Sequence, residues 1–299
     1  MNGLVALALS ALLFPAAPPP AAWDLLLRGG RIVDGSGNPW FEGDLAIHGD
    51  RIAAIGSLDP SHAARTIDVA GLVVAPGFID MLGQSEYTVL ADPHLRSKIT
   101  QGITTELTGE GSSVAPMTPW IVGEARPMTT DLRLSIDWSD LRGYFHRVKS
   151  QGTAINFAHM VGAAQVRMAV LQGENRPPRP AELETMLGHV AAAMRQGAFG
   201  LSSSLIYPPG AFADTGELVE MAKVAARHGG FYATHVRGES DDLLVSLAEA
   251  ARIGEQAAIP VEIWHLKAAG RQNWGRMTEA LAAIEAARVH AWSGRNGRD

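Results

Sequence analysis

A strand-helix-strand segment between Gly229 and Gly270 constrains the fold of this chain more than any other stretch. Its helical part, from Ser240 to Ala258, opens with a residue type that caps helices, has two acids in its first turn and repeats apolar residues at helical spacing. Two strands joined by such a crossover helix are parallel. The segment therefore predicts a parallel sheet of the α/β class.

Each of the two strands in this segment ends in a histidine, His235 and His265. The carboxyl ends of parallel strands meet on one face of the sheet, where α/β barrels build their active sites. We therefore expect the two imidazoles to lie side by side and to bind a metal ion. The alternative is a pair of hydrogen-bonded structural histidines.

The composition limits the available ligands and partners. The chain has 299 residues, of which 46% are hydrophobic, and this length suits one large domain with a small one. Cysteine is absent, so a metal would have to be bound by His, Asp, Glu or a modified Lys. The net charge of -6 and the lack of Lys and Arg runs argue against nucleic acid as a partner.

Residues 1–22 have the pattern of a secretory signal peptide. An apolar run from Leu4 to Phe14 is too short to span a bilayer, and small residues and prolines follow it. No Lys or Arg precedes the run, so an unprocessed tail is the alternative. We expect a periplasmic or secreted protein, otherwise a cytoplasmic one, without a membrane span; the oligomeric state stays open.

Short strands separated by glycine-rich turns predict a small β-sheet domain over residues 23–75. The candidate strands are Leu25–Leu27, Arg31–Val33, Asp44–Ile47 and Arg51–Ile55. A continuous apolar run from Leu72 to Met81 follows, which is typical of a barrel strand buried on both faces. It would open the second domain, residues 76–299.

Strands and helices alternate through the second domain. The expected helices are Pro93–Gln101, Asp137–Gly152, Ala181–Gln196, Ser240–Ala258 and Thr278–Ala287. The Pro- and Thr-rich stretch from Ser112 to Asp137 is expected to be a long functional loop. Apolar periodicity stops after Ala287, and about six strand-helix units are expected where a closed barrel has eight.

Several motifs resemble the D-aminoacylase (N-acyl-D-amino-acid deacylase) family of the metal-dependent amidohydrolase superfamily. GLSSSLIYPPGAFADTGEL is the most specific, PGFID closes the first expected barrel strand, and HLKAAGRQNWG begins at His265. The resemblance runs from about Trp23 to Ala287. It implies an incomplete TIM-like (β/α) barrel behind a small β-sandwich domain, and a zinc-dependent hydrolase that converts an N-acyl-D-amino acid and water into a D-amino acid and a carboxylate.

The resemblance implies that His235 and His265 bind zinc, but other family ligands are replaced. The two histidines of the family's H-x-H pair fall on Leu82 and Gln84. Leucine cannot ligate a metal and glutamine is a weak ligand, so the α site of the family's two-metal centre is expected to be missing. We therefore expect one zinc, in the β site, instead of two.

Glu110 is the expected third ligand. The family's cysteine ligand falls on Gly111, and Glu110 is its ligand-capable neighbour. The alternative is that Glu110 hydrogen-bonds the amides of a glycine-rich turn. Glu106 is a weaker candidate because it lies within the strand, where its side chain would point in a different direction from the strand axis. We expect His159 to support the core or the ligands, and Asp80 either to orient a site group or to cap a turn.

Two residues match positions near the family's substrate. Lys267 corresponds to a lysine that faces the substrate carboxylate and, two residues beyond His265 in a strand, would share its face. Tyr207 either contacts substrate or stacks under the two prolines that follow it. Arg237 and Glu239 lie in the loop after the first histidine and either support the site or are solvated.

The expected substrate is a small N-acyl amino acid. The family's proton-shuttling aspartate belongs to an eighth strand and is expected beyond residue 299, so the chain as written is expected to be a fragment that folds and hydrolyses poorly alone. Two alternatives stay open. One is another amidohydrolase specificity, dihydroorotase-like or isoaspartyl-dipeptidase-like, and the other is an inactive remnant or binding module without stoichiometric zinc.

Overall fold

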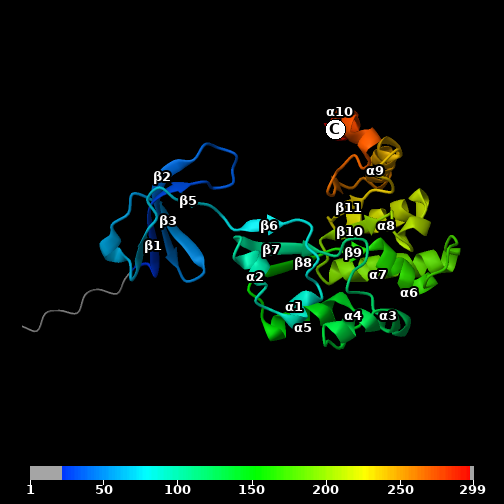
Figure 1. Ribbon diagram of the computed structural model, residues 1–299, viewed down its shortest axis with the longest axis horizontal. Helices are drawn as coiled ribbons and strands as arrows, with labels where there is room; N and C mark the ends of the chain where they lie inside the picture. Colours follow the sequence, from blue (N-terminus) through cyan, green and yellow to red (C-terminus); the bar gives the residue numbers. More distant parts are fainter. Residues whose placement is uncertain (1–21, 297–299) are drawn as a thin grey trace, which may run out of the picture. The chain divides into compact units, whose positions relative to one another are not determined.

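The computed structural model describes residues 22–296, and the chain divides into two compact units, residues 1–76 and 77–299 (Figure 1). The signal-peptide prediction covers residues 1–22, of which residues 1–21 lie outside the described part. Within residues 22–296, no helix combines the length and the apolar character needed to cross a membrane.

The first unit is built on one five-stranded sheet with the order β3-β2-β1-β4 and with β5 beside β1. Its strands are β1 (Leu25–Ile32), β2 (Phe41–His48), β3 (Arg51–Gly56), β4 (Thr66–Asp68) and β5 (Val73–Val74). β1, β2 and β3 are antiparallel, whereas β4 and β5 run parallel to β1. A β-sandwich consists of two packed sheets, whereas residues 22–76 form one sheet. These residues therefore do not form the expected β-sandwich.

The apolar run from Leu72 to Met81, which the sequence predicts as one strand, is divided between the two units. β5 pairs with β1 in the first unit, whereas β6 (Phe78–Asp80) pairs with β7 in the second. Pro76 and Gly77 separate the two strands. Proline has no N–H for a sheet and glycine weakens a strand, so the run cannot continue as one ladder.

The second unit contains a series of parallel strands in chain order. β6, β7 and β8 form one sheet, and β9, β10, β11 and β12 form another. Met160 alone separates β8 from β9, so the two sheets follow one another. The bounds are β7 (Ile103–Thr108), β8 (Asn156–His159), β9 (Val161–Gly162), β10 (Gly200–Ser204), β11 (Phe231–His235) and β12 (Val261–Ile263).

Helices connect successive strands and pack against them. The longer ones are α5 (Leu141–Gln151), α6 (Ala163–Leu171), α7 (Pro180–Arg195), α8 (Thr215–Arg227), α9 (Leu243–Ala257) and α10 (Met277–Asn296). In Figure 1, α6, α7 and α8 lie beside β9, β10 and β11, and α6 and α8 contact β10. The main core fills this layer, with Met186, Leu201, Leu218 and Tyr232 fully buried. This packing holds the ends of the parallel strands in place.

The predicted loop from Ser112 to Asp137 contains two short helices, α3 (Pro119–Glu124) and α4 (Arg126–Asp131). Thr118 caps α3 by accepting a hydrogen bond from the N–H of Ile121, and proline occupies the first turn. A capping Thr before Pro is a helix start signal, so the loop prediction was wrong in this part.

Helix boundaries differ from the sequence prediction at both ends of the last two helices. α9 begins at Leu243, three residues after Ser240, and its N-cap position is Asp242. α10 extends to Asn296, although the apolar pattern ends near Ala287. The extension contains one Ala and two Arg among residues of low helix propensity, so local propensity does not explain why the helix continues. The short helices α1 (Thr88–Ala91) and α2 (Arg96–Ile99) precede β7.

Candidate metal centre

His235 is the last residue of β11, a strand whose last four residues are buried. β11 lies between β10 and β12 in the parallel series, so its carboxyl end is held from both sides. The His235 side chain is only 8% exposed. The fold therefore supplies a rigid, nearly dry imidazole.

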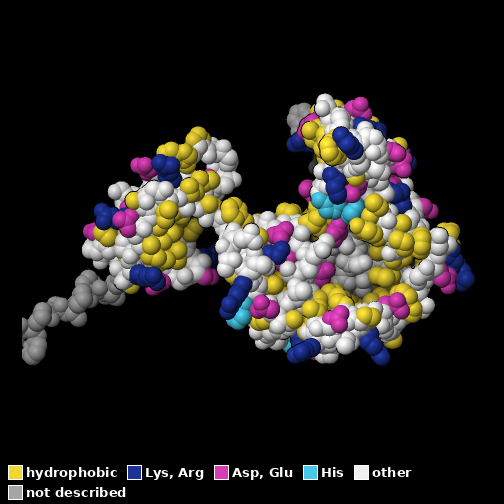
Figure 2. Space-filling model, in the orientation of Figure 1, with side chains coloured by type: hydrophobic (Ala, Val, Ile, Leu, Met, Phe, Trp, Pro, Cys, Tyr) yellow, Lys and Arg dark blue, Asp and Glu magenta, His cyan; other side chains and the backbone are white. Residues whose placement is uncertain are grey.

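His265 follows β12 by two residues and is not its last residue. Its backbone φ of 37° lies in the left-handed region, which is unusual for a residue other than glycine. The turn brings its ring to within 4.3 Å of the His235 ring, centroid to centroid, at 82°. The predicted side-by-side arrangement is present, but a strained turn produces it. Figure 2 shows histidine side chains (cyan) at the surface of the second unit with acidic side chains nearby.

Glu110 completes the cluster from the turn after β7. Gly109 and Gly111 flank it with φ of 94° and 66°. A Cβ at Gly111 would come within 2.4 Å of the Ser204 Cβ, so a side-chain ligand cannot occupy that position. This collision explains physically why the adjacent glutamate, and not residue 111, reaches the histidines.

One carboxylate oxygen of Glu110 contacts both imidazoles. Oε1 lies 3.1 Å from Nδ1 of His235 and 3.0 Å from Nε2 of His265. The other oxygen, Oε2, accepts a hydrogen bond from Nε2 of Gln84 at 2.7 Å. Burial favours a higher pKa for Glu110, but the hydrogen bonds from His265, His235 and Gln84 together lower it below its usual value. The residue is therefore an anion under ordinary conditions.

The three groups fit a zinc ion. Their candidate ligand atoms all lie within 4.8 Å of one another, and this is a single such group of His, Asp and Glu within residues 22–296. Zinc with ligands at about 2.0 to 2.1 Å requires separations of about 3.3 to 3.5 Å between them in a tetrahedron. Two imidazoles and one carboxylate are a donor set that zinc accepts.

Glu239 lies on the opposite side of the two imidazoles. Its Oε1 is 3.2 Å from Nε2 of His235 and 3.4 Å from Nδ1 of His265. Nε2 of His235 is buried and has no well-aligned hydrogen bond, so the Glu239 contact is electrostatic rather than a formed hydrogen bond. A carboxylate facing the second nitrogen of a metal-binding histidine commonly orients the ring. The sequence had left Glu239 between a supporting and a solvated role, and the structure places it 9% exposed at the site.

Lys267 contacts this acid. Its Nζ donates to Glu239 and lies 3.0 Å from Nδ1 of His265. β12 ends at Ile263, so the expectation that Lys267 shares a strand face with His265 was wrong. A turn, not strand alternation, brings the ammonium to the site, and its side chain is 48% exposed.

Tyr207 lies at the open side of the histidines. Its ring meets the His235 ring edge-on at 5.4 Å between centroids, and the residue is 60% exposed. It therefore stacks on a histidine, which neither of the two alternatives from the sequence had specified.

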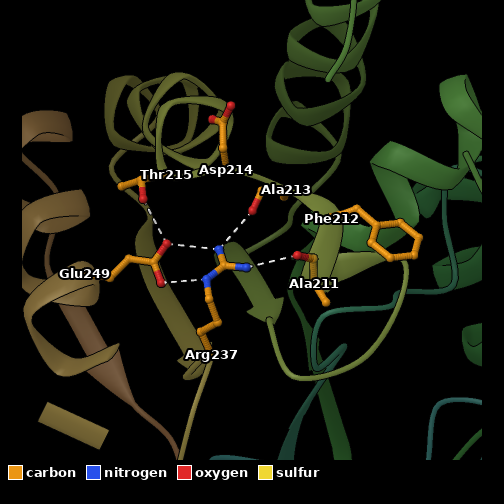
Figure 3. A pocket seen from close by; sticks show the side chains of 7 residues that line it. All are labelled: Ala211, Phe212, Ala213, Asp214, Thr215, Arg237 and Glu249. Atoms are coloured by element: carbon orange, nitrogen blue, oxygen red, sulfur yellow. Dashed lines mark hydrogen bonds and ion pairs between the residues drawn. The ribbon is translucent and has the colours of Figure 1, made fainter. Parts of the chain in front are cut away.

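Arg237 belongs to a different structure. Figure 3 shows its guanidinium bound to the carboxylate of Glu249 and to the carbonyl oxygens of Ala211 and Ala213. Thr215 donates to the same carboxylate at 2.9 Å. These bonds tie the loop before α8 to α9, so Arg237 fixes the connection beneath the strand ends and does not join the metal cluster.

His159 is also outside the cluster. It is 1% exposed, its Nδ1 lies 2.5 Å from Oγ1 of Thr108, and its Nε2 accepts from the N–H of Val114 at 3.2 Å. Burial lowers the pKa of His159 to about 3, so the ring is neutral. Both nitrogens are occupied, and the residue holds the segment that follows Glu110.

The acids near β6 and β7 form a separate ion-pair group. Lys98 lies 2.6 Å from Asp80 and 3.4 Å from Glu106, whose side chain is fully buried. Leu82 packs against an apolar cluster that includes Trp264. These placements keep Asp80 and Glu106 out of the group of candidate metal ligands.

A pocket of about 560 Å³ opens beside the metal centre. Glu110 is part of its lining, together with Gln84 and Glu86. Sequence reasoning missed Glu86, because the residues that surround it come from distant segments and no motif marks it. The lining places a second carboxylate next to the candidate ligand.

No family model matches the chain, but comparison with known proteins finds relatives that are D-aminoacylases or related deacylases. A D-aminoacylase from Alcaligenes xylosoxydans xylosoxydans is 40% identical over 270 residues, which cover 89% of this chain and 55% of that protein. An N-acyl-D-glutamate deacylase from the same organism is 36% identical over 268 residues, which cover 89% of this chain and 54% of that protein. The chain thus spans about half the length of the curated relatives it matches.

Solved structures agree with the sequence relatives. A D-aminoacylase described for its binuclear metal centre superposes with a TM-score of 0.82 and 38% identity, covering 89% of this chain and 56% of that one. An N-acyl-D-glutamate deacylase from Bordetella bronchiseptica, solved with zinc and a phosphonate inhibitor, superposes with a TM-score of 0.82 and 35% identity. The match covers 90% of this chain and 56% of that one. An L-hydantoinase from Arthrobacter aurescens, at 18% identity and a TM-score of 0.55, shows likeness of fold alone.

Proposed function

The chain is a homologue of the D-aminoacylases and the N-acyl-D-glutamate and N-acyl-D-aspartate deacylases, and from this premise we propose that it is a zinc-dependent hydrolase of N-acyl-D-amino acids. The observation that carries the proposal is the convergence of Glu110, His235 and His265 on one point at the carboxyl ends of parallel strands. The substrate class follows from the relatives and from the cation beside the site.

Zinc bound by these three residues would polarise the amide carbonyl and lower the pKa of a water molecule. The chain's own residues prepare that position. Glu110 supplies a fixed negative charge beside the inner nitrogens, Nδ1 of His235 and Nε2 of His265. With zinc bound, these two nitrogens would give the ion their lone pairs, while the carboxylate of Glu239 would lie beside the outer nitrogens and orient the rings.

We propose one zinc, of the β type. Leu82 is an aliphatic side chain packed among apolar residues, so it offers no ligand. The amide nitrogen of Gln84 is used on Glu110, which makes this residue a partner of a ligand. The donors that a second ion would need are therefore replaced by packing and by a hydrogen bond.

Lys267 is proposed to bind the substrate carboxylate. Its ammonium is half-exposed and is held by Glu239 beside His265, so a carboxylate that approaches the histidines meets a positioned cation. Tyr207 is proposed to cover the same opening, since its ring leans on His235 and is otherwise exposed.

The fold proposed around this site is a TIM-like barrel of about six strand-helix units. The chain-order series of parallel strands from β6 to β12 supports it, with helices in every connection except the one between β8 and β9. A periplasmic or secreted location is proposed from the pattern of residues 1–22 alone.

Zinc-dependent binding of N-acetyl-D-methionine tests the proposal, with the L-enantiomer and the chelated protein as controls. Calorimetry should show D-selective binding that disappears on chelation and in His265→Ala. Release of free D-methionine is measured on the same samples. Equal binding of both enantiomers, or binding that survives both chelation and the substitution, would remove the basis for the assignment.

A further inference from the structure

We propose that the pocket beside the metal centre selects substrates that carry a cationic, hydrogen-bond-donating group, and that Glu86 determines this selection. The inference rests on the proposed function, because it assigns a part of the substrate to a place. The lining residues that matter are Gln84, Glu86, Glu110, Met128, Asp131 and Leu132.

The pocket adjoins the metal centre through Glu110. Glu110 lines it and also contacts both histidines, so a substrate whose amide lies at the histidines would extend one arm into this space. The volume of about 560 Å³ is in the range of small-molecule sites, which are about 300 to 1,000 Å³. The space therefore suits a chain of several carbon atoms with a polar end.

The charge of the lining has one sign. Glu86, Glu110 and Asp131 contribute carboxyl groups, and none of the described residues that line the pocket is Lys, Arg or His. Above about pH 7, where Glu86 is ionised, these carboxylates disfavour an anionic ligand and attract a cation.

Glu86 has unused hydrogen-bonding capacity. Its Oε2 is buried and accepts no hydrogen bond from residues 22–296, whereas both oxygens of Glu110 have partners. A buried carboxylate oxygen without a donor is costly, and a donor on a ligand would remove that cost. Protein atoms enclose this oxygen, so a ligand N–H group would supply the missing donor when the carboxyl group turns toward the pocket.

The electrostatics of Glu86 support the same conclusion. Burial, followed by the negative charges of Glu106 and Glu110, raises the pKa of Glu86 to about 7, although a hydrogen bond from its own backbone acts in the opposite direction. A ligand cation beside Glu86 would stabilise its carboxylate form and so lower its pKa again.

The rest of the lining defines the shape of the preferred ligand. Met128, Leu132 and the ring of Tyr87 supply apolar surface. Apolar walls leading to a carboxylate match an aliphatic chain with a terminal ammonium or guanidinium, because such a chain packs along its carbons and presents its charge at the end. The pocket around Arg237 differs, since its charges already pair with each other.

Binding of five compounds to the zinc-loaded protein tests the proposal. Nα-acetyl-D-lysine is compared with its neutral counterpart N-acetyl-D-norleucine and with N-acetyl-D-glutamate. A second arm compares N-(6-aminohexanoyl)-D-alanine with N-hexanoyl-D-alanine, because the cation could belong to the side chain or to the acyl group. We expect the cationic member of one pair to bind at least about tenfold more tightly than its neutral counterpart, as a charge-assisted hydrogen bond allows. The arm that shows this preference identifies which part of the substrate enters the pocket.

Glu86→Gln should reduce that preference to less than about twofold while the zinc content is unchanged. Glu124→Gln, the same change at an exposed position outside the pocket, should leave the preference intact. Equal affinities within both pairs, tighter binding of the glutamate derivative, or a preference that survives Glu86→Gln would overturn the proposal. Failure of all five compounds to bind would instead contradict the proposed function, and with it the inference.

Discussion

Replacing Glu86 by Gln should change the pH dependence of stability, because the folded chain holds this carboxyl in an environment that resists ionisation. Its pKa rises from an ordinary 4.5 to about 7 through burial and the charges of Glu106 and Glu110. Glu86 retains its proton in the folded state between these values, whereas the unfolded chain releases it. The stability contributed by protonated Glu86 is therefore complete below pH 4.5 and is lost as the pH rises through about 7.

The size of the effect follows from the shift. One pKa unit corresponds to about 1.4 kcal/mol, so ionised Glu86 costs up to about 3 kcal/mol above pH 7. Glutamine resembles the protonated acid and does not titrate. Relative to wild type, Glu86→Gln should therefore gain about 2 to 3 kcal/mol in its free energy of unfolding between pH 5 and pH 8.

Urea denaturation of the zinc-free protein, followed by tryptophan fluorescence at both pH values, measures this gain. The change between the two pH values is the relevant quantity, since an unpartnered amide would cost a similar amount at each. Glu124→Gln, the same substitution at an exposed position, is the matched control. A constant gap between wild type and Glu86→Gln would refute the assigned environment of the carboxyl.

The other predictions concern the residues around the histidines. His235→Ala and His265→Ala should each abolish stoichiometric zinc by elemental analysis. His159→Ala should keep the zinc and lose about 2 kcal/mol of stability by denaturation, since it leaves the buried N–H of Val114 without a partner and removes one of two partners of the Thr108 hydroxyl. Glu239→Gln should weaken zinc about 10- to 100-fold in competition titrations, and an unchanged affinity would return Glu239 to a merely solvated role. Arg237→Gln should lower the unfolding free energy by about 2 kcal/mol without loss of zinc, and zinc loss would place Arg237 in the site.

The sequence could predict the two histidines because parallel strands deliver their carboxyl ends to one face, and the crossover helix between them is a local pattern. Glu110 required the resemblance as well, and its physical reason appeared only when Gly111 was seen against Ser204. The α/β character of the second unit is equally a matter of periodicity.

Other features depend on tertiary contacts that no local pattern records. The strand expected from Leu72 to Met81 divides because its two halves find different partners, and apolar composition cannot show that. Lys267 and Glu239 meet through turns whose direction is set by a left-handed residue at His265. Glu86 carries no motif, and its significance comes from the absence of a donor near one oxygen.

An anomalous difference map, measured at the zinc absorption edge on crystals of the zinc-loaded protein, tests the central claim most directly. We expect one strong peak per chain at about 2.0 to 2.2 Å from Glu110, His235 and His265. A peak coordinated by other residues, or zinc-loaded crystals with no peak between these three side chains, would contradict it.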